Sequence, residues 1–269
     1  MAVAALQSSL FTDEQEAVVH YTDVYKRFGS KVVLDGLTLD VRRGEALALL
    51  GRSGTGKSVT LKLLIGLLRP DKGKVRVGGA DLDDMNERDL TRMRRHIGMV
   101  FQGGALFDSM SVKENVAYGL REHFRFAESK IAERVRECLS LVGLEENVEK
   151  LEPGALSGGM RKRVAIARAI ATWPELLLYD EPTAGLDPAT TNQVNSLIVS
   201  LKQRLGVTSI IVTHDMPSAF QVADRLALLE KGRIVWSGDT AEAREAPPAP
   251  LARFLDTDTE EDAWTSLES

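Results

Sequence analysis

Residues 51–58, GRSGTGKS, combine a lysine, hydroxyl groups and three glycines at the spacing G-x-x-x-x-G-K-[ST]. Glycines let the backbone approach an anion closely, so that its amides can point at phosphate oxygens. Lys57 can supply positive charge to the β- and γ-phosphates of a nucleotide, and the Ser58 hydroxyl can ligate Mg²⁺. An apolar run precedes this loop and a helical run, 59–68, follows it, as a phosphate site requires. The predicted nucleotide contacts come from Gly51, Arg52, Ser53, Gly54, Thr55, Gly56, Lys57, Ser58 and Val59.

A pair of carboxylates, Asp180 and Glu181, follows the apolar run 176–179. Beside a phosphate loop the two can divide the work: Asp180 holds the Mg²⁺ shell, and Glu181 activates the attacking water as a general base. Taken alone, such a pair is more typical of a helix N-cap. The phosphate loop favours the catalytic interpretation.

Two further polar side chains stand at the ends of apolar runs: His214 after 209–212 and Gln102 after 97–101. His214 is predicted to hydrogen-bond the γ-phosphate and to position the water, although a lone histidine is more often structural. The Gln102 amide could contact both metal and water and so sense the triphosphate, although a glutamine here commonly just faces solvent. The candidate catalytic residues are Lys57, Gln102, Glu181 and His214, and the candidate metal ligands are Ser58, Gln102 and Asp180.

These groups can meet only if the runs 46–50, 176–179 and 209–212 lie in one sheet. Each run is short and almost continuously apolar, which is typical of a strand buried on both faces in a parallel sheet covered by helices. Ligands of open α/β sheets bind beyond the carboxyl ends of the strands. We therefore predict an α/β fold in which the three polar ends converge on one edge.

The other segments predict additions to that core. Short β-rich runs between Val18 and Glu45 indicate antiparallel strands with tight turns. About 125 residues separate the first two buried strands, too many for one crossover, and 127–144 has helical periodicity. A helical subdomain, about 103–172, is therefore expected between them. After His214, the sequence indicates a hairpin that turns at Lys231–Gly232.

The composition narrows the class of protein. With 269 residues, 43 % of them hydrophobic, the chain can form one sizeable core with attachments. A net charge of -5 disfavours nucleic acid as a partner, and a single cysteine, Cys138, excludes a disulfide framework and fits a reducing cytoplasm. No apolar run approaches the roughly 20 residues that cross a bilayer, so any membrane role is expected to come through a partner. The predicted boundaries are a loose lead-in at 1–16, the main domain at 17–240, and a linker with an acidic tail at 241–269.

The stretch LSGGM, 156–160, has the composition of a helix start whose free backbone N–H groups hold an anion. No strand leads into it, however, although a strand normally precedes the phosphate site that a chain builds for itself. The sequence alone therefore leaves open whose phosphate this loop contacts.

Six motifs together resemble, in order and spacing, those of ATP-binding-cassette (ABC) ATPases. The resemblance covers about residues 17–240 and implies a P-loop NTPase core with an N-terminal antiparallel β subdomain and an inserted helical subdomain. It also implies that the chain binds ATP and Mg²⁺ and hydrolyses ATP as a head-to-tail homodimer. The motifs are GRSGTGKS (51–58), Gln102, LSGGM (156–160), LLLYDE (176–181), AGLD (184–187) and His214.

In such a dimer each active site is shared between two subunits. The resemblance implies that the LSGGM loop of one subunit donates to the γ-phosphate held by the other, and that the AGLD loop crosses the interface. An aromatic residue before the first turn is expected to stack on adenine; Phe28 matches best, Tyr25 is the competitor, and simple β-sheet packing is the alternative. The residues implied in the loops between the subunits are Ser157, Gly158, Gly159 and Asp187.

Three local segments are similar, more narrowly, to the Mla-type (MlaF-like) ATPases of phospholipid transporters: 101–123, LSGGM with Met160, and 182–188. Most cassettes carry glutamine at the position of Met160, and methionine cannot make the polar contacts of an amide. The resemblance implies three partners: an integral membrane permease, an MCE-type substrate-binding protein and a small STAS-type regulatory subunit. It places the chain at the cytoplasmic face of the inner membrane, where it would power phospholipid transport for envelope lipid asymmetry.

Two apolar groups lie outside the motifs. Leu106, Phe107 and Met110 are predicted to line a groove for a cytoplasmic helix of the permease, or else to pack the helical subdomain. Leu251, Phe254 and Leu255 share helical spacing, and Trp264 follows in the acidic tail. A solvated tail is the preferred interpretation, and docking onto a partner subunit or a regulator is the alternative.

Two other functions compete with phospholipid transport. The first is transport of another cargo, such as an amino acid or a lipoprotein. The second is a non-transport ATPase acting in DNA repair or translation. Repair proteins of this family insert long coiled coils between the phosphate loop and LSGGM, and translation factors usually carry two cassettes. Only about 100 residues separate these motifs here, which disfavours the second function.

Overall fold

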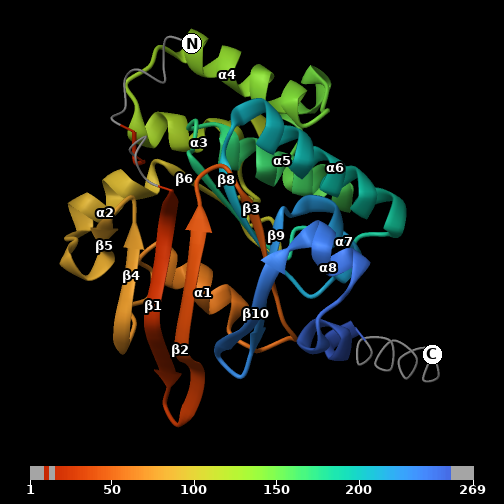
Figure 1. Ribbon diagram of the computed structural model, residues 1–269. Helices are drawn as coiled ribbons and strands as arrows, with labels where there is room; N and C mark the ends of the chain where they lie inside the picture. Colours follow the sequence, from red (N-terminus) through yellow and green to blue (C-terminus); the bar gives the residue numbers. More distant parts are fainter. Residues whose placement is uncertain (1–8, 12–15, 256–269) are drawn as a thin grey trace.

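The computed structural model describes residues 9–11 and 16–255, which form two sheets and a lobe of helices (Figure 1). The larger sheet has six strands in the order β10-β9-β3-β8-β7-β6, and all its pairs are parallel except β9 with β10. The three predicted core strands are therefore neighbours, and the hairpin at Lys231–Gly232 is confirmed. The bounds are β3 Ala46–Leu50, β6 Ile97–Val100, β7 Leu176–Asp180, β8 Thr208–Thr213, β9 Arg225–Glu230 and β10 Arg233–Asp239.

The central strands β3, β7 and β8 are buried along their whole length, which explains their continuous apolar runs. Because side chains alternate along a strand, β7 contributes to two cores. Leu176 and Leu178 pack with the helix that follows the phosphate loop, whereas Leu177 and Tyr179 pack with the helices of the opposite face. This sheet is therefore covered on both sides, as the sequence predicts.

The smaller sheet is antiparallel, in the order β2-β1-β4-β5, and it confirms the predicted β subdomain. The arginine of β10, Arg233, binds Asp35 of β2 at 2.8 Å and so ties the two sheets together beside the phosphate loop. Gly232 permits this approach, because a Cβ there would lie 2.8 Å from the Asp35 nitrogen. The bounds are β1 Ala17–Phe28, β2 Lys31–Arg42, β4 Lys72–Val77 and β5 Ala80–Asp81.

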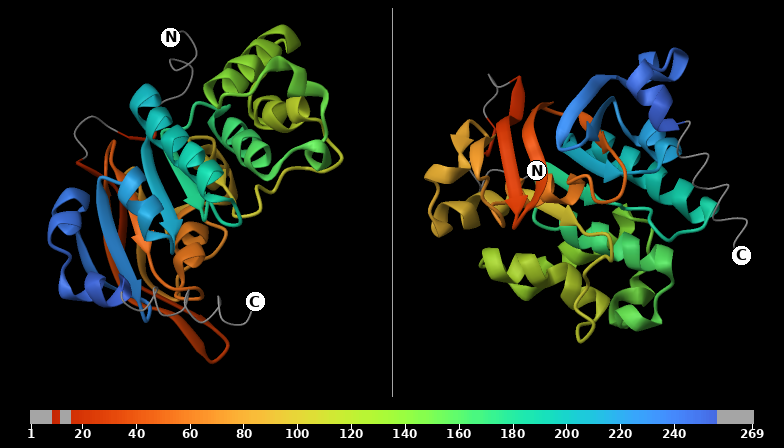
Figure 2. Two further views of the ribbon diagram at one scale, coloured as in Figure 1. Left: turned by 90° about the vertical axis from the view of Figure 1, so that its right-hand side faces the viewer. Right: turned by 90° about the horizontal axis from the view of Figure 1, so that it is seen from below.

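The predicted helical subdomain is inserted between β6 and β7, and Figure 2 shows its green helices to one side of the sheets. The apolar residues that give 127–144 its helical periodicity, Ile131, Val135, Leu139 and Val142, are all buried. Ser111 and Glu114 form a capping box at the start of α3. The helices are α3 Val112–His123, α4 Glu128–Leu141 and α5 Gly158–Ile170, with 3-10 turns at Glu146–Lys150 and Pro153–Ala155.

Among the described residues, four other helices connect strands, and α8 follows the last strand, β10. The helix α1 ends at Leu64 rather than at residue 68, because Gly66 adopts a left-handed φ of +67°. No helix of the described residues is both long and apolar enough to span a membrane. The bounds are α1 Lys57–Leu64, α2 Glu87–Arg94, α6 Pro188–Leu205, α7 Met216–Val222 and α8 Thr240–Glu245, with a 3-10 turn at Leu82–Asp84.

The C-terminal prediction needs correction. The predicted linker that begins at 241 is mostly helical as far as residue 255, because α8 extends to Glu245 and residues 249–255 are also helical. Leu251 and Phe254 are buried against β3, β9 and α7 of the same chain, so the solvated tail is wrong as far as Leu255. Burial of their apolar side chains holds this segment in place. Trp264 and the acidic tail lie outside the described residues.

The lead-in is not loose at residues 9–11, where Phe11 is buried and Glu175 accepts hydrogen bonds. The Glu175 carboxylate accepts from the Leu10 amide at 2.7 Å and the Ser9 hydroxyl at 2.5 Å, and it contacts His96 Nδ1 at 2.8 Å. Burial alone would raise the pKa of Glu175, but these contacts outweigh burial and hold the pKa at about 2.

Glu175→Gln should lower the unfolding free energy by about 1.5–3 kcal/mol at pH 7, the contribution typical of hydrogen bonds to a charged group. Because the folded pKa is depressed, this contribution is present above the unfolded value near 4.5 and is lost as pH falls toward 2. Urea unfolding at pH 7, 5 and 4 measures it. The exposed pair Arg121–Glu128 provides the control, since solvent screens this ion pair and E128Q should lower the unfolding free energy far less than E175Q does. An equal loss for E175Q at pH 4 and pH 7 would contradict the assignment.

Candidate functional site

The phosphate loop joins the end of β3 to the start of α1. The Lys57 ammonium is buried and donates to the carbonyl oxygens of Gly51 at 2.5 Å and Arg52 at 3.1 Å. Only glycine fits two positions of the loop. A Cβ on Gly51 would lie 2.6 Å from the Leu229 carbonyl oxygen, and Gly56 has a φ of +109°. The loop therefore forms a backbone cradle with one positive charge at its centre.

Asp180 lies beside this loop at the end of β7. Its carboxylate accepts a hydrogen bond of 2.8 Å from the Ser58 hydroxyl. Burial raises the pKa of Asp180 above its usual value, although the Ser58 hydrogen bond opposes that rise. A bound cation would offset this cost of burying the charge.

The donor set fits Mg²⁺. Ser58 and Asp180 offer hard oxygen ligands next to the phosphate cradle. The described residues contain no group of three or more His, Cys, Asp or Glu side chains that could enclose a metal ion by themselves. This suits Mg²⁺, which usually takes one or two protein oxygens and completes its shell with substrate phosphates and water.

Glu181 follows Asp180 and holds an unusual backbone conformation. Its φ of +49° lies in the left-handed region, which a non-glycine residue adopts at a cost of about 1–3 kcal/mol. Its carboxylate contacts His214 Nδ1 at 2.9 Å and the Lys57 ammonium at 3.5 Å. The N-cap alternative for Asp180 and Glu181 is wrong, because turns follow them and the next helix is capped by Asp187.

The separate segments meet around one cavity of about 420 Å³. The predicted convergence is therefore observed: the cavity brings together the phosphate loop, Gln102, Glu181 and His214. Phe28 lines it with its side chain 47 % exposed, whereas Tyr25 does not. The lining residues are Phe28, Lys31, Val33, Ser53, Gly54, Gly56, Lys57, Ser58, Val59, Gln102, Glu181 and His214.

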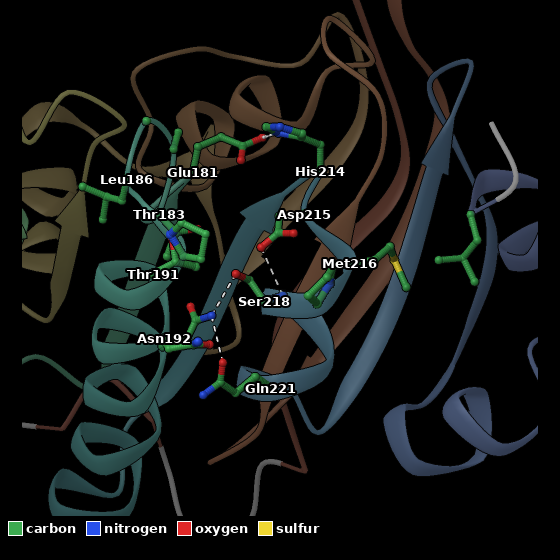
Figure 3. A pocket seen from close by; sticks show the side chains of 16 residues that line it. Glu181, Thr183, Leu186, Thr191, Asn192, His214, Asp215, Met216, Ser218 and Gln221 are labelled. Atoms are coloured by element: carbon green, nitrogen blue, oxygen red, sulfur yellow. Dashed lines mark hydrogen bonds and ion pairs between the residues drawn. The ribbon is translucent and has the colours of Figure 1, made fainter. Parts of the chain in front are cut away.

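Glu181 and His214 also border a second cavity of about 780 Å³. Figure 3 shows the two side chains facing each other at its edge, with Thr183, Asp215 and Ser218 further along the wall. This cavity lies between α6 and α7. Glu181, the candidate general base, therefore borders both cavities within a single chain.

The LSGGM loop does not reach the cavity of its own chain. Ser157 caps α5 by accepting from the Met160 amide at 3.2 Å. Gly159 packs on the start of α6, since a Cβ there would lie 2.6 Å from Thr190 Cγ2. Asp187 caps α6 in turn, by accepting from the amide and the hydroxyl of Thr190. The backbone N–H groups at the start of α5 therefore belong to a surface outside their own phosphate site.

Lys162 is a residue of the site region that the sequence analysis missed. It lies on α5 and is buried, and its ammonium donates to the carbonyl oxygens of Gln102 and Glu181. The sequence did contain a signal for this residue: Lys162 lies at helical spacing from Ala165 and Ala169, which places a basic residue on the apolar face of α5.

The comparisons with known proteins agree with this geometry. The family model described as "ABC transporter" matches residues 34–184. The chain is 41 % identical, over 95 % of its length and 70 % of the relative's, to methionine import ATP-binding protein MetN from Rhizobium johnstonii. It is 42 % identical, over 86 % of its length and 71 % of the relative's, to protein TRIGALACTOSYLDIACYLGLYCEROL 3 from Arabidopsis thaliana. With probable ribonucleotide transport ATP-binding protein mkl from Mycobacterium leprae, identity is 45 % over 86 % of this chain and 66 % of that one.

A solved structure is also similar: the dimeric post-hydrolysis state of the ATP-binding cassette MJ0796 bound to ADP and Pi. It matches with a TM-score of 0.76 and 33 % identity over 82 % of this chain and 98 % of that one. A shorter cassette of similar fold is therefore dimeric when it is bound to ADP and Pi.

Replacing Glu181 with glutamine keeps the size of the side chain and removes the carboxylate. We expect ATP turnover to fall at least about 100-fold, the usual contribution of a positioned base, while ATP still binds. Phosphate release and a nucleotide titration measure the two effects. As a control, Glu230→Gln changes an exposed carboxylate at the end of β9 and should leave turnover unchanged. Turnover of E181Q within tenfold of the wild type would exclude Glu181 as the general base.

Proposed function

This chain belongs to the ABC transporter family, and we propose that it powers phospholipid transport through a separate membrane permease. The chain is an ATPase that binds ATP with Mg²⁺, and cassettes of this family form dimers and associate with membrane permeases. Our proposal adds to this the roles of single residues, the cargo and the further partners. The observation that carries the catalytic roles is the convergence of five chain segments on the 420 Å³ cavity.

The cavity divides into binding and reacting groups. Phe28 stacks on adenine, and the amides of residues 51–59 with Lys57 hold the phosphates. Ser58, Asp180 and Gln102 hold Mg²⁺, which when bound offsets negative charge on the phosphates. Glu181 takes the proton of the attacking water. His214, which contacts the Glu181 carboxylate at 2.9 Å, hydrogen-bonds the γ-phosphate and positions that water.

The second half of each site comes from the partner subunit. Ser157, Gly158 and Gly159 present free amides and the positive end of α5 on a surface outside their own cavity. In a head-to-tail dimer these groups donate to the γ-phosphate bound by the other subunit, and Asp187 lies at the interface. Dimerisation is then a requirement for hydrolysis.

The cargo proposal rests on the resemblance of 101–123, Met160 and 182–188 to Mla-type ATPases. Met160 packs, partly buried, against the core cluster that the helical subdomain shares with β7 and α6. One relative carries the name of a glycolipid, trigalactosyldiacylglycerol. Two others are named for methionine import and for ribonucleotide transport, so an amino acid or a nucleotide is the competing cargo.

Purification of the native complex from membranes in mild detergent tests the cargo. Mass spectrometry should find a permease, an MCE-type protein, a small STAS-type subunit and bound phospholipid. The complex would lie at the cytoplasmic face of the inner membrane. A complex that contains no MCE-type protein and binds methionine or a nucleoside would contradict the lipid assignment. Lipid analysis of a deletion strain separates the same alternatives in the cell.

The permease is proposed to dock on the segment that follows Gln102. Leu106 packs into the helical subdomain, but Phe107 is 41 % exposed and lies against the half-exposed ring of Tyr118, with centroids 4.8 Å apart. Buried Asn115 binds both the amide and the carbonyl of Phe107, so the ring is presented on a fixed backbone. An apolar side chain held rigidly at the surface suits a helix of a partner.

Phe107→Asp should therefore release the permease while the nucleotide affinity changes less than about twofold, because Phe107 does not line the 420 Å³ cavity. Co-purification with the permease and a nucleotide titration measure the two effects. The matched control is Leu67→Asp, at an apolar residue that is 57 % exposed elsewhere on the molecule, and it should keep the permease bound. Loss of nucleotide affinity in F107D would count against the docking proposal.

A further inference from the structure

Lys162 is a buried cation that the proposed mechanism does not use. Its side chain is only 6 % exposed, although it lies on α5 just after the LSGGM loop. Its ammonium donates to two backbone carbonyl oxygens, that of Gln102 and that of Glu181 at 3.4 Å. Within residues 16–255, no ion pair joins it to a carboxylate.

Burying this charge is costly, because an ammonium loses its hydration inside the protein. Burial lowers the pKa of Lys162, and the nearby negative charges of Glu181 and Asp180 act in the opposite direction. A methionine would fill the same space without that cost, and replacing buried charges by apolar side chains is often neutral or stabilising. A buried charge beside a reaction centre therefore suggests a role in function.

The two carbonyls belong to the two segments whose placement the reaction needs. Glu181 has a left-handed φ of +49°, which persists only where neighbouring groups hold the backbone. The Glu181 amide donates to the Val212 carbonyl at 2.9 Å, and the Glu181 carbonyl accepts a hydrogen bond from the Lys162 ammonium. Gln102 is held through the same ammonium, so the general base and the candidate sensor share one anchor.

We propose that Lys162 is a positioning residue that links the start of α5 to the backbones of Gln102 and Glu181. A movement of the helical subdomain then moves the general base and the sensor together. Lys162 does not line the nucleotide cavity, so it acts through these two residues and not on ATP itself. The proposal rests on the catalytic roles proposed for Glu181 and Gln102.

The test is steady-state ATP hydrolysis by the full chain carrying K162M or K162R. Because the ligand contacts remain, K162M should lower kcat at least about tenfold and leave the KM for ATP within about twofold. K162R keeps a charged donor and should recover at least about a third of the lost kcat. Lys130→Met makes the same change at an exposed lysine of α4 and should leave both constants unchanged.

A second measurement separates positioning from structure. In the E181Q background, K162M should lower the residual rate less than about threefold, because the Glu181 carboxylate is already absent and only the placement of Gln102 is left to lose. If the rate of the double variant falls by the product of the losses in K162M and E181Q, the proposal is overturned. A K162M variant that keeps more than half of the wild-type kcat, or that changes only the KM for ATP, would overturn it as well. A K162M variant that loses its cooperative unfolding transition, with no recovery in K162R, would show a purely structural role.

The same experiment distinguishes failure of the role proposed for Glu181 from failure of the role proposed for Lys162. If E181Q by itself retains turnover, then the proposed role of Glu181 fails. If E181Q is inactive and K162M is fully active, then only the role of Lys162 fails.

Discussion

A small cluster of buried, opposite charges lies at the carboxyl edge of the parallel sheet, and the rest of the structure must hold these charges in place. Lys57, Asp180 and Glu181 are each less than 10 % exposed, and Lys57 lies 3.5 Å from Glu181. Buried charges are tolerated only where partners hold them in place. The strands β3 and β7 supply that rigidity, because both are buried along their whole length. The strand β3 leads into the loop that positions Lys57 at the start of α1, and β7 ends at Asp180, directly before Glu181.

The helical subdomain adds what the sheet cannot supply. It places the N-terminus of α5, which Ser157 caps, on a surface away from the phosphate loop of the same chain. On the same helix, Lys162 donates hydrogen bonds to the backbones of Gln102 and Glu181. One helix, α5, therefore contacts the backbones of Gln102 and Glu181 through Lys162, and in the proposed dimer the amides at its start face the second subunit. In the proposed mechanism, α5 connects closure of the dimer to the placement of Glu181.

Several elements could be predicted because their signals are local. Continuous apolar runs identified β3, β7 and β8, and the glycine pattern of 51–58 identified the phosphate cradle. The bounds and the buried face of α6 were not predicted, although Val194, Ile198 and Leu201 lie on that face at helical spacing. The docking of Leu251 and Phe254 could not be predicted, because a short apolar pattern does not reveal whether its own chain offers a surface to cover it.

The sequence by itself determined the residue types at the site, the positions of three buried strands along the chain and the resemblance to ABC ATPases, because glycine spacing and continuous apolar runs are local patterns of neighbouring residues. Only the tertiary structure decided that Phe28 rather than Tyr25 borders the cavity, that Asp180 and Glu181 do not cap a helix, and that Lys162 lies behind them. These outcomes depend on packing between segments up to about 150 residues apart, such as Phe28 and Glu181, and no local pattern encodes such contacts.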